Sequence, residues 1–299
     1  CLGQFNLKVK RKSRMGQLEM GVRAYAPTVG MSPKLVPVPE IVCSINEDPE
    51  KIRENIKYNI KRGFSQVEPH ETQDKVIGLV VGGPTLKETF SDLLYKNKNG
   101  MPVISVNGSH KYCSDNGVNP SAMVMLDSRE FNNRFVDPII KDCKYFISSQ
   151  CHPSVFDRLE DCETWIWHCA GDEDNEDLLK EQYVNNYFPV MGGSTVTLRA
   201  IHLFRMLGFC KFEVYGFDSC IIGQHHAYDQ KENDGEQAID VVVANKEFKC
   251  TAAHYHQAKE FVQMITKTGE YYDLAVHGDG LISHIIKNPD SLRKKEEVN

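Results

Sequence analysis

The sequence contains no apolar run close to the about 20 residues that a membrane-spanning helix needs, and no apolar segment with a small-residue cleavage site. We therefore expect a protein without a membrane span, located in the cytoplasm. Positive charge is not in excess either, because the 299 residues carry a formal net charge of −6. Such a chain has no overall field that attracts nucleic acid, so nucleic acid is not an expected partner.

Paired cysteines and the common nucleotide fingerprints are also absent. The ten cysteines are scattered without a Cys-x-x-Cys pair, which argues against a structural zinc site. Several lie in apolar runs, where a free cysteine behaves as a small hydrophobic residue, and this indicates reduced thiols. Neither Gly-x-Gly-x-x-Gly nor Gly-x-x-x-x-Gly-Lys-Ser/Thr occurs. NAD enzymes and P-loop kinases are therefore disfavoured.

The most informative stretch that is present covers residues 75–88. An apolar run over 76–81 ends in a Gly-Gly-Pro-Thr turn, and a helical pattern of apolar residues follows. Glycines allow a ligand to approach the backbone, and the first turn of a helix presents N–H groups that favour an anion. The residues expected to bind the phosphate are Gly82, Gly83, Pro84 and Thr85. A plain tight connection is the alternative. If the site is a phosphate cradle, Gly83→Val should abolish nucleotide binding and leave the protein folded.

Other short apolar runs predict further strands. They cover 101–106, 122–126, 145–148, 164–168 and 212–215, with helical patterns between them. Two of these runs end at Asn107 and Asp127. Ligands of open parallel sheets lie beyond the carboxyl ends of the strands, so both residues should share one rim with Gly82 and Gly83. We predict an α/β fold, Rossmann-like, with a mostly parallel sheet and helices on both faces, plus an extended N-terminal arm.

Three segments are expected along the chain. Residues 1–48 form the arm, because they hold four prolines between positions 27 and 39 that disfavour helix and sheet interiors. The arm would lie on the domain or on a partner subunit, which makes a homo-oligomer an open alternative. Residues 49–290 form a Rossmann-like nucleotide-binding transferase domain. Residues 291–299 form a charged, disordered tail.

A second block of interest covers residues 189–230. Gly193, Ser194 and Thr195 open another predicted helix, and a predicted strand over 212–215 is followed by Asp218. These residues could hold the other half of a nucleotide. A polar stretch then carries His225, His226, Tyr228, Gln230 and Asn233. It has no apolar periodicity, so it is better suited to recognition than to a core.

Together these two blocks resemble a known group of proteins. The segment from Gly82 to Glu88 resembles the Gly-x-Gly-Pro-Ser-Leu motif of the MptE-like (6-hydroxymethylpterin pyrophosphokinase-like) family, which also includes motility accessory factors and is related to Campylobacter-type bacterial sialyltransferases. The segment from Gly192 to Asp218 resembles their helix, Leu-Gly, strand, Gly-x-Asp signature. Residues 119–127 are similar to their Pro-Asp…Asp block. The resemblance covers roughly residues 75–286.

The resemblance implies a nucleotide-dependent transferase whose nucleotide lies at residues 82–85 and 193–195. The first hypothesis is a glycosyltransferase that uses a CMP-nonulosonate-like donor, an acceptor of unknown identity and no metal for chemistry. The alternative is an MptE-like pyrophosphokinase that uses ATP and Mg²⁺, with Asp127 and Asp218 holding the metal. A nucleotide-binding module without catalysis is a third possibility. No cofactor other than this Mg²⁺ is expected.

A glycosyl transfer needs a base for the acceptor hydroxyl, and histidine is ionisable near neutral pH. The candidates are His226, His254 and His256, and His226 is favoured because its polar stretch follows the rim at Asp218. The predicted catalytic residues are thus His226, Asp218 and Asp127. A structural histidine is the alternative for each imidazole, and helix or loop capping is the alternative for each aspartate.

Overall fold

The computed structural model describes residues 21–23, 47–171, 173–184, 186–230, 236–268 and 272–289. Most of the predicted arm and the whole of the predicted tail lie outside these residues. The predicted segment boundaries therefore remain predictions. In the part of the chain that is described, no helix has the length and apolar character that crossing a membrane would require.

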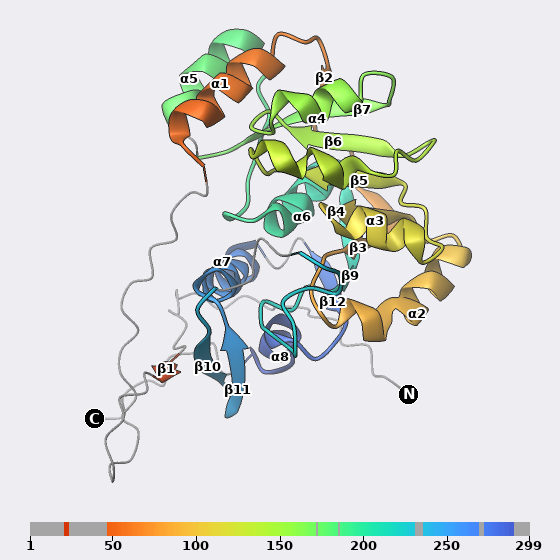
Figure 1. The fold of residues 1–299 in the computed structure, drawn as a ribbon, viewed down its shortest axis with the longest axis vertical. Coiled ribbons are helices and arrows are strands. Elements are labelled where there is room, and N and C mark those ends of the chain that lie inside the picture. Colours follow the sequence, from red (N-terminus) through yellow and green to blue (C-terminus); the bar gives the residue numbers. More distant parts are fainter. Residues whose placement is uncertain are drawn as a thin grey trace.

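A parallel sheet runs through the centre of the molecule (Figure 1). Its strand order is β12-β9-β3-β4-β5-β6-β7-β2, with β8 paired to β7, and every pair in it is parallel. The strands are β2 (Ser65–Gln66), β3 (Gln73–Val80), β4 (Val103–Val106), β5 (Ala122–Met125), β6 (Lys144–Ser148), β7 (Thr164–Cys169), β8 (Pro189–Val190), β9 (Phe209–Tyr215) and β12 (Asp273–Val276). The predicted apolar runs coincide with the central strands, because strands covered on both faces need apolar side chains on both.

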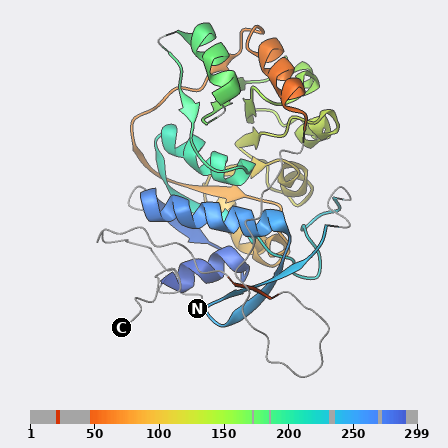
Figure 2. The same ribbon diagram turned by 90° about the vertical axis from the view of Figure 1, so that its left-hand side faces the viewer.

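Helices cover both faces of this sheet, as predicted. They are α1 (Pro49–Asn59), α2 (Leu86–Lys98), α3 (Ser109–Asp115), α4 (Pro153–Arg158), α5 (Glu173–Tyr183), α6 (Val196–Met206), α7 (Ala252–Thr268) and α8 (Leu281–Lys287), with a 3₁₀ helix η1 (Glu130–Val136). Alternate strand residues face different helices: Leu79 packs in one core with α6, α7 and α8, whereas Val80 packs in another with α2. Figure 2 shows α6 and α7 on the same side of the sheet.

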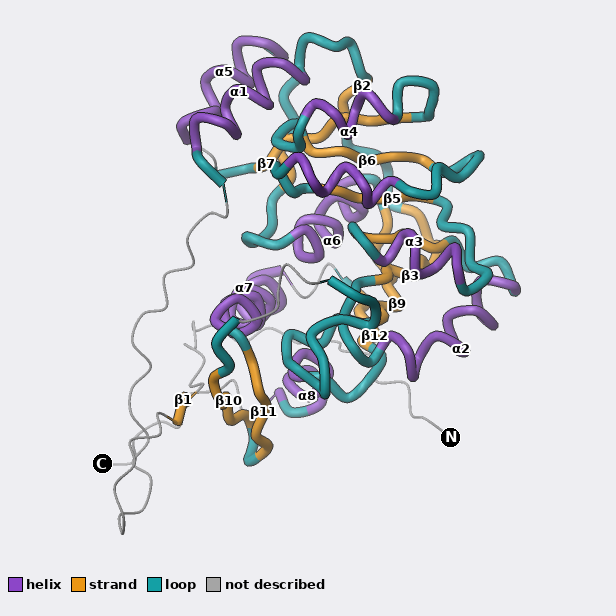
Figure 3. The backbone as a smooth tube through the Cα atoms, viewed as in Figure 1, coloured by secondary structure: helices purple, strands orange, loops and turns teal. Residues whose placement is uncertain are grey.

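A small antiparallel sheet was not predicted. It has the order β1-β10-β11 and consists of β1 (Gly21–Arg23), β10 (Ile239–Val243) and β11 (Lys246–Cys250). Ala244 and Asn245 form the turn between β10 and β11 with positive φ angles of 46° and 65°. Figure 3 shows this hairpin beside α7 and α8. An Ala-Asn turn lacks the Asn-Gly or Asp-Gly signature that marks a hairpin in a sequence, which is why the pattern was missed.

Candidate functional site

The candidate site lies where the parallel strands end. Strand β3 is flanked by β4 on one side and β9 on the other, and the chain returns to β9 only after building β4 to β7. Asn107 directly follows the end of β4, and Gly82 and Asp127 lie two residues beyond the ends of β3 and β5. The predicted common rim is therefore confirmed. The change of direction between β3 and β9 is the topological switch point at which open α/β sheets bind ligands.

Asp218 bridges the two strands at this point. Its carboxylate accepts a hydrogen bond from Thr85 N at 2.9 Å and another from Thr85 Oγ1 at 2.6 Å. Gly83 N donates to Gly216 O at 2.8 Å beside it. Asp218 is only 2% exposed. Burial raises the pKa of its carboxyl group, while the two hydrogen bonds from Thr85 act in the opposite direction. The carboxylate thus caps the start of α2, at the position that the sequence suggested for a phosphate.

This bridge corrects one expectation. A Cβ atom built on Gly83 would lie 2.4 Å from Gly216 O and 2.5 Å from the carboxylate of Asp218. The first of these is a backbone atom that cannot move without disturbing the switch point. A valine at Gly83 is therefore incompatible with an undisturbed fold, so the expectation that Gly83→Val leaves the protein folded is wrong.

A tyrosine ring packs on the neighbouring glycines. A Cβ atom on Gly82 would lie 2.3 Å from the hydroxyl oxygen of Tyr228, and one on Gly108 would lie 2.7 Å from the same ring. Ala227 N donates to Gly82 O at 2.9 Å. The segment that follows Asp218, here called the 219–230 loop, is therefore held against the glycine turn. Of the polar residues predicted to face the cradle, Tyr228 does so. Asn233 lies outside the described residues.

The histidines of this region form a group. The His226 ring stacks near that of Tyr228, with centroids 5.8 Å apart and planes at 19°. The rings of His225 and His254 are 6.0 Å apart. Burial, and then the charges of His225 and His226, lower the pKa of His254 to about 4. His254 also exchanges hydrogen bonds with Thr251 at the start of α7, which is a capping role.

The third candidate base, His256, lies 3.4 Å from Glu260 on the same helix. Its partner Glu260 also accepts hydrogen bonds at the second predicted phosphate site. Ser194 N donates to both carboxylate oxygens of Glu260 at 2.9 Å, and Ser194 Oγ donates to one of them at 2.8 Å. A Cβ atom on Gly193 would meet the same carboxylate at 2.4 Å. Both predicted phosphate positions thus hold a carboxylate of the protein itself.

Gln257 connects the two predicted halves of the site. Its Nε2 donates to Thr195 Oγ1 at 2.9 Å, and its Oε1 accepts from Ser219 Oγ at 2.7 Å. Ser219 adjoins Asp218, so one polar chain runs from Thr85 across the end of β9 to the start of α6. Sequence reasoning missed Gln257 and Glu260. The only available signal was two polar residues three apart on a helix, which is ordinary for a solvent-exposed face.

Asp127 is paired with an arginine. Arg129 donates from N and Nε to Asp127 Oδ1 at 3.0 and 2.9 Å, and from Nη2 to Oδ2 at 2.6 Å. Burial alone would raise the pKa of Asp127, but these hydrogen bonds outweigh it and hold the pKa below its ordinary value. Within the described residues, no group of three His, Cys, Asp or Glu side chains could hold a metal ion. The Mg²⁺ site predicted at Asp127 and Asp218 remains a prediction, because one or two carboxylates together with the donor phosphates can hold this ion.

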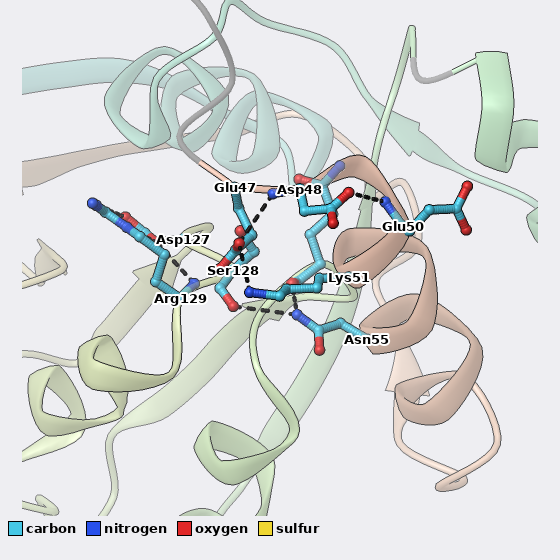
Figure 4. Close-up of polar contacts among 9 residues, drawn as sticks. Glu47, Asp48, Glu50, Lys51, Asn55, Asp127, Ser128 and Arg129 are labelled. Atoms are coloured by element: carbon cyan, nitrogen blue, oxygen red, sulfur yellow. Dashed lines mark hydrogen bonds and ion pairs between the residues drawn. The ribbon is translucent and has the colours of Figure 1, made fainter.

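Helix α1 holds the loops that follow β5 and β6 at the rim. Asn55 Nδ2 donates to the carbonyl oxygens of Ser128 at 3.2 Å and Gln150 at 3.0 Å. Figure 4 shows Asn55 reaching from α1 to the segment that carries Asp127 and Arg129. One turn later, Asn59 Nδ2 donates to the carbonyl oxygens of Ser149 and Cys151, on either side of Gln150. Asp48 caps the start of the helix, because its side chain accepts from Glu50 N at 3.0 Å.

An open groove of about 730 Å³ lies elsewhere, around Lys75, Lys96 and Glu213. Met101 and Pro102, which precede β4, also line it. It is therefore at the amino ends of the strands, away from the rim. None of the predicted site residues lines this groove.

Comparisons with known proteins agree with this geometry. Residues 50–224 match the sequence model of a family described as MptE-like, 6-hydroxymethylpterin diphosphokinase MptE-like. The fold is similar to that of a MAf glycosyltransferase from Magnetospirillum magneticum AMB-1, with a TM-score of 0.59 and 13% sequence identity. The similarity covers 81% of this chain but only 41% of that chain. No curated protein matches the sequence.

Proposed function

Because the chain belongs to the MptE-like family, we propose that it is a nucleotide-dependent transferase, and specifically a glycosyltransferase that uses a CMP-nonulosonate-like donor. The observation that carries the proposal is the 2.9 Å hydrogen bond from Ala227 N to Gly82 O. It joins the histidine-bearing 219–230 loop to the glycine turn at the topological switch point. An ionisable imidazole is thereby held beside the position where α/β folds of this kind bind a nucleotide.

Each residue of the site has its own role in this proposal. The nucleotide binds along the rim at residues 82–85, Asn107 and the start of α6, beside the carboxylates of Asp218 and Glu260 and not in their place, since these accept from Thr85 N and Ser194 N. His226 accepts the proton of the acceptor hydroxyl as its oxygen attacks the anomeric carbon, and the bond from the sugar to the nucleotide phosphate breaks. Asp218 and Asp127 act indirectly, because their oxygens hold Thr85 and Arg129. The resemblance of the fold to a glycosyltransferase supports this assignment.

The alternative is a diphosphokinase that transfers pyrophosphate from ATP, which is favoured by the description of the family. That reaction depends on Mg²⁺ bridging the donor phosphates. The pairing of Asp127 with Arg129 weighs against it, since both oxygens of the carboxylate already accept hydrogen bonds from a guanidinium group. The two functions therefore differ in their expected dependence on a divalent metal.

Donor turnover separates these functions. The protein would be incubated with a CMP-activated nonulosonate, or with ATP and 6-hydroxymethylpterin, each with Mg²⁺ or with EDTA. Release of CMP that persists in EDTA supports glycosyl transfer, and AMP release that requires Mg²⁺ supports the diphosphokinase. Binding of a nucleotide without turnover of any donor would leave a binding module. His226→Ala should lower turnover by about 10² and leave donor affinity unchanged, whereas the control His225→Ala should retain turnover.

A further inference from the structure

Two cysteines face each other where the 219–230 loop meets the small antiparallel sheet. Ile221 N donates to Lys249 O at 2.7 Å, and these two residues form an antiparallel bridge. The register of the bridge places Cys220 opposite Cys250, the last residue of β11. Because Ile221 and Lys249 are the hydrogen-bonded pair, the two cysteines occupy the neighbouring position without hydrogen bonds, where opposite side chains lie closest.

The spacing at such a position suits a disulfide bond. Opposite Cα atoms in a pair without hydrogen bonds are about 4.5 Å apart, and disulfide bonds join Cα atoms that are about 4.4–6.8 Å apart. Cys220 and Cys250 belong to the same apolar core. The Cys250 thiol donates to Ser219 O at 3.4 Å, and this carbonyl group directly precedes Cys220. Rotation of the two side chains can therefore bring the sulfur atoms together while the register of the bridge is kept.

The surroundings of the two thiols control when they react. Both cysteines are buried in the folded chain. Burial raises the pKa of Cys220 to about 11, and burial together with the charge of Cys220 raises the pKa of Cys250. Since the thiolate is the form that attacks an oxidant, the reaction requires the bridge at Ile221 to open locally and admit water. The next residue, Ile222, is 41% exposed, so the bridge lies close to the surface.

We propose that Cys220 and Cys250 form an oxidation site, at which a low-molecular-weight disulfide converts the two thiols into an intramolecular disulfide bond. One protein thiolate attacks the small disulfide, which gives a mixed disulfide and releases one small thiol. The second thiolate attacks the protein sulfur of the mixed disulfide and releases the second small thiol. Two protein S–H bonds and one small S–S bond are consumed, and one protein S–S bond and two small S–H bonds are formed.

The disulfide bond would fasten the 219–230 loop to the hairpin of β10 and β11. Cys220 lies two residues after Asp218, so the bond holds the chain directly beyond the switch point. It keeps the bridge at Ile221 closed and leaves the contact between Ala227 N and Gly82 O in place. Oxidation would thus stabilise the loop whether or not the chain is a glycosyltransferase.

Peptide mapping of the full chain tests the site. The folded protein is treated with glutathione disulfide, its remaining thiols are blocked, and it is digested without reduction. We expect a peptide in which Cys220 is linked to Cys250. This linkage should be absent from Cys220→Ser and retained in the control Cys210→Ser, which removes a less buried thiol.

Thermal unfolding measures the effect of the bond. A disulfide that closes a segment of about 30 residues restricts the unfolded chain, so the oxidised wild type should melt at least about 4 °C above the protein reduced with dithiothreitol. Cys220→Ser should melt at the same temperature after either treatment. Cys210→Ser should show the same rise as the wild type.

Several results would overturn the proposal. Cys220 and Cys250 recovered as free thiols or as mixed disulfides, with any linkage confined to other cysteines, would exclude the site. Linkage of the pair only after urea is added would show that the folded chain does not bring the thiols together. A linked pair with an unchanged or lower melting temperature would exclude the stabilising role. The map of the wild type decides even where Cys220→Ser does not fold, and donor turnover tests the proposed function separately.

Discussion

Replacing Asp218 by alanine is the sharpest test of the switch point. The change removes the acceptor for Thr85 N and Thr85 Oγ1, and Thr85 is only 1% exposed, so water cannot replace it. The buried N–H of Thr85 left without a partner costs about 1–3 kcal/mol, and loss of the bond from its hydroxyl adds about 1 kcal/mol. The change also removes the cost of burying a carboxylate, which the raised pKa of Asp218 reflects, and this offsets part of the loss. We expect Asp218→Ala to lower the free energy of unfolding by about 2–4 kcal/mol.

Urea unfolding at neutral pH measures the effect. The slope of the free energy of unfolding against urea concentration should be unchanged, which shows that the unfolding transition is the same. Thr85→Val, which removes only the hydroxyl bond, should cost about 1 kcal/mol. The double variant should show a coupling of at least about 0.5 kcal/mol, since the two residues share both bonds. Asp218→Asn keeps one acceptor without the charge and should be milder than alanine. A free energy of unfolding for Asp218→Ala within about 0.5 kcal/mol of the wild type would refute the capping role.

Three further results are expected. The free energy of unfolding should fall as the pH drops from about 6.5 to about 4, because the folded protein keeps His254 neutral with a pKa of about 4 and unfolding lets it bind a proton. Urea unfolding over a series of pH values measures this, and His254→Asn should weaken the dependence of the free energy on pH. The same pH dependence in His254→Asn as in the wild type would contradict this. Asn59→Ala should cost about 2–3 kcal/mol in the same assay because its two buried bonds to the loop after β6 are lost, whereas the exposed control Asn116→Ala should cost under about 0.5 kcal/mol. Gly82→Ala should lower the melting temperature of the wild type but not of Tyr228→Ala, since the three atoms nearest to its Cβ all belong to Tyr228. Equal shifts in both backgrounds would show that another contact is responsible.

Much of the central sheet was predictable because its chemistry is local. A strand buried on both faces needs consecutive apolar residues, as in the segments that became β4 and β5. The polar residue after each run then marks its carboxyl end, and parallel pairing places these ends on one edge. The rim with Gly82, Asn107 and Asp127 followed from these rules alone. The resemblance to the MptE-like family, which the sequence model confirms, rested on the same two glycine-containing blocks.

The occupants of the predicted phosphate positions could not be predicted in this way. Asp218 lies 133 residues from Thr85, and Glu260 lies 66 residues from Ser194. A carboxylate at the start of a helix satisfies the same N–H groups as a phosphate, so the local pattern is identical for a cap and for a ligand site. The proposed catalytic roles of His226, Asp218 and Asp127 accordingly remain predictions.

The sequence by itself determined the α/β class, the strands and the edge at which a ligand would bind, because apolar periodicity and glycine turns act over a few residues. Only the tertiary structure decided what fills that edge. The ring of Tyr228 on Gly82 and Gly108, and the chain of hydrogen bonds through Gln257, join segments that no local pattern connects. Glycine at those two positions indicates that there is no room for a side chain, and only the fold shows that the ring of Tyr228 takes up that space.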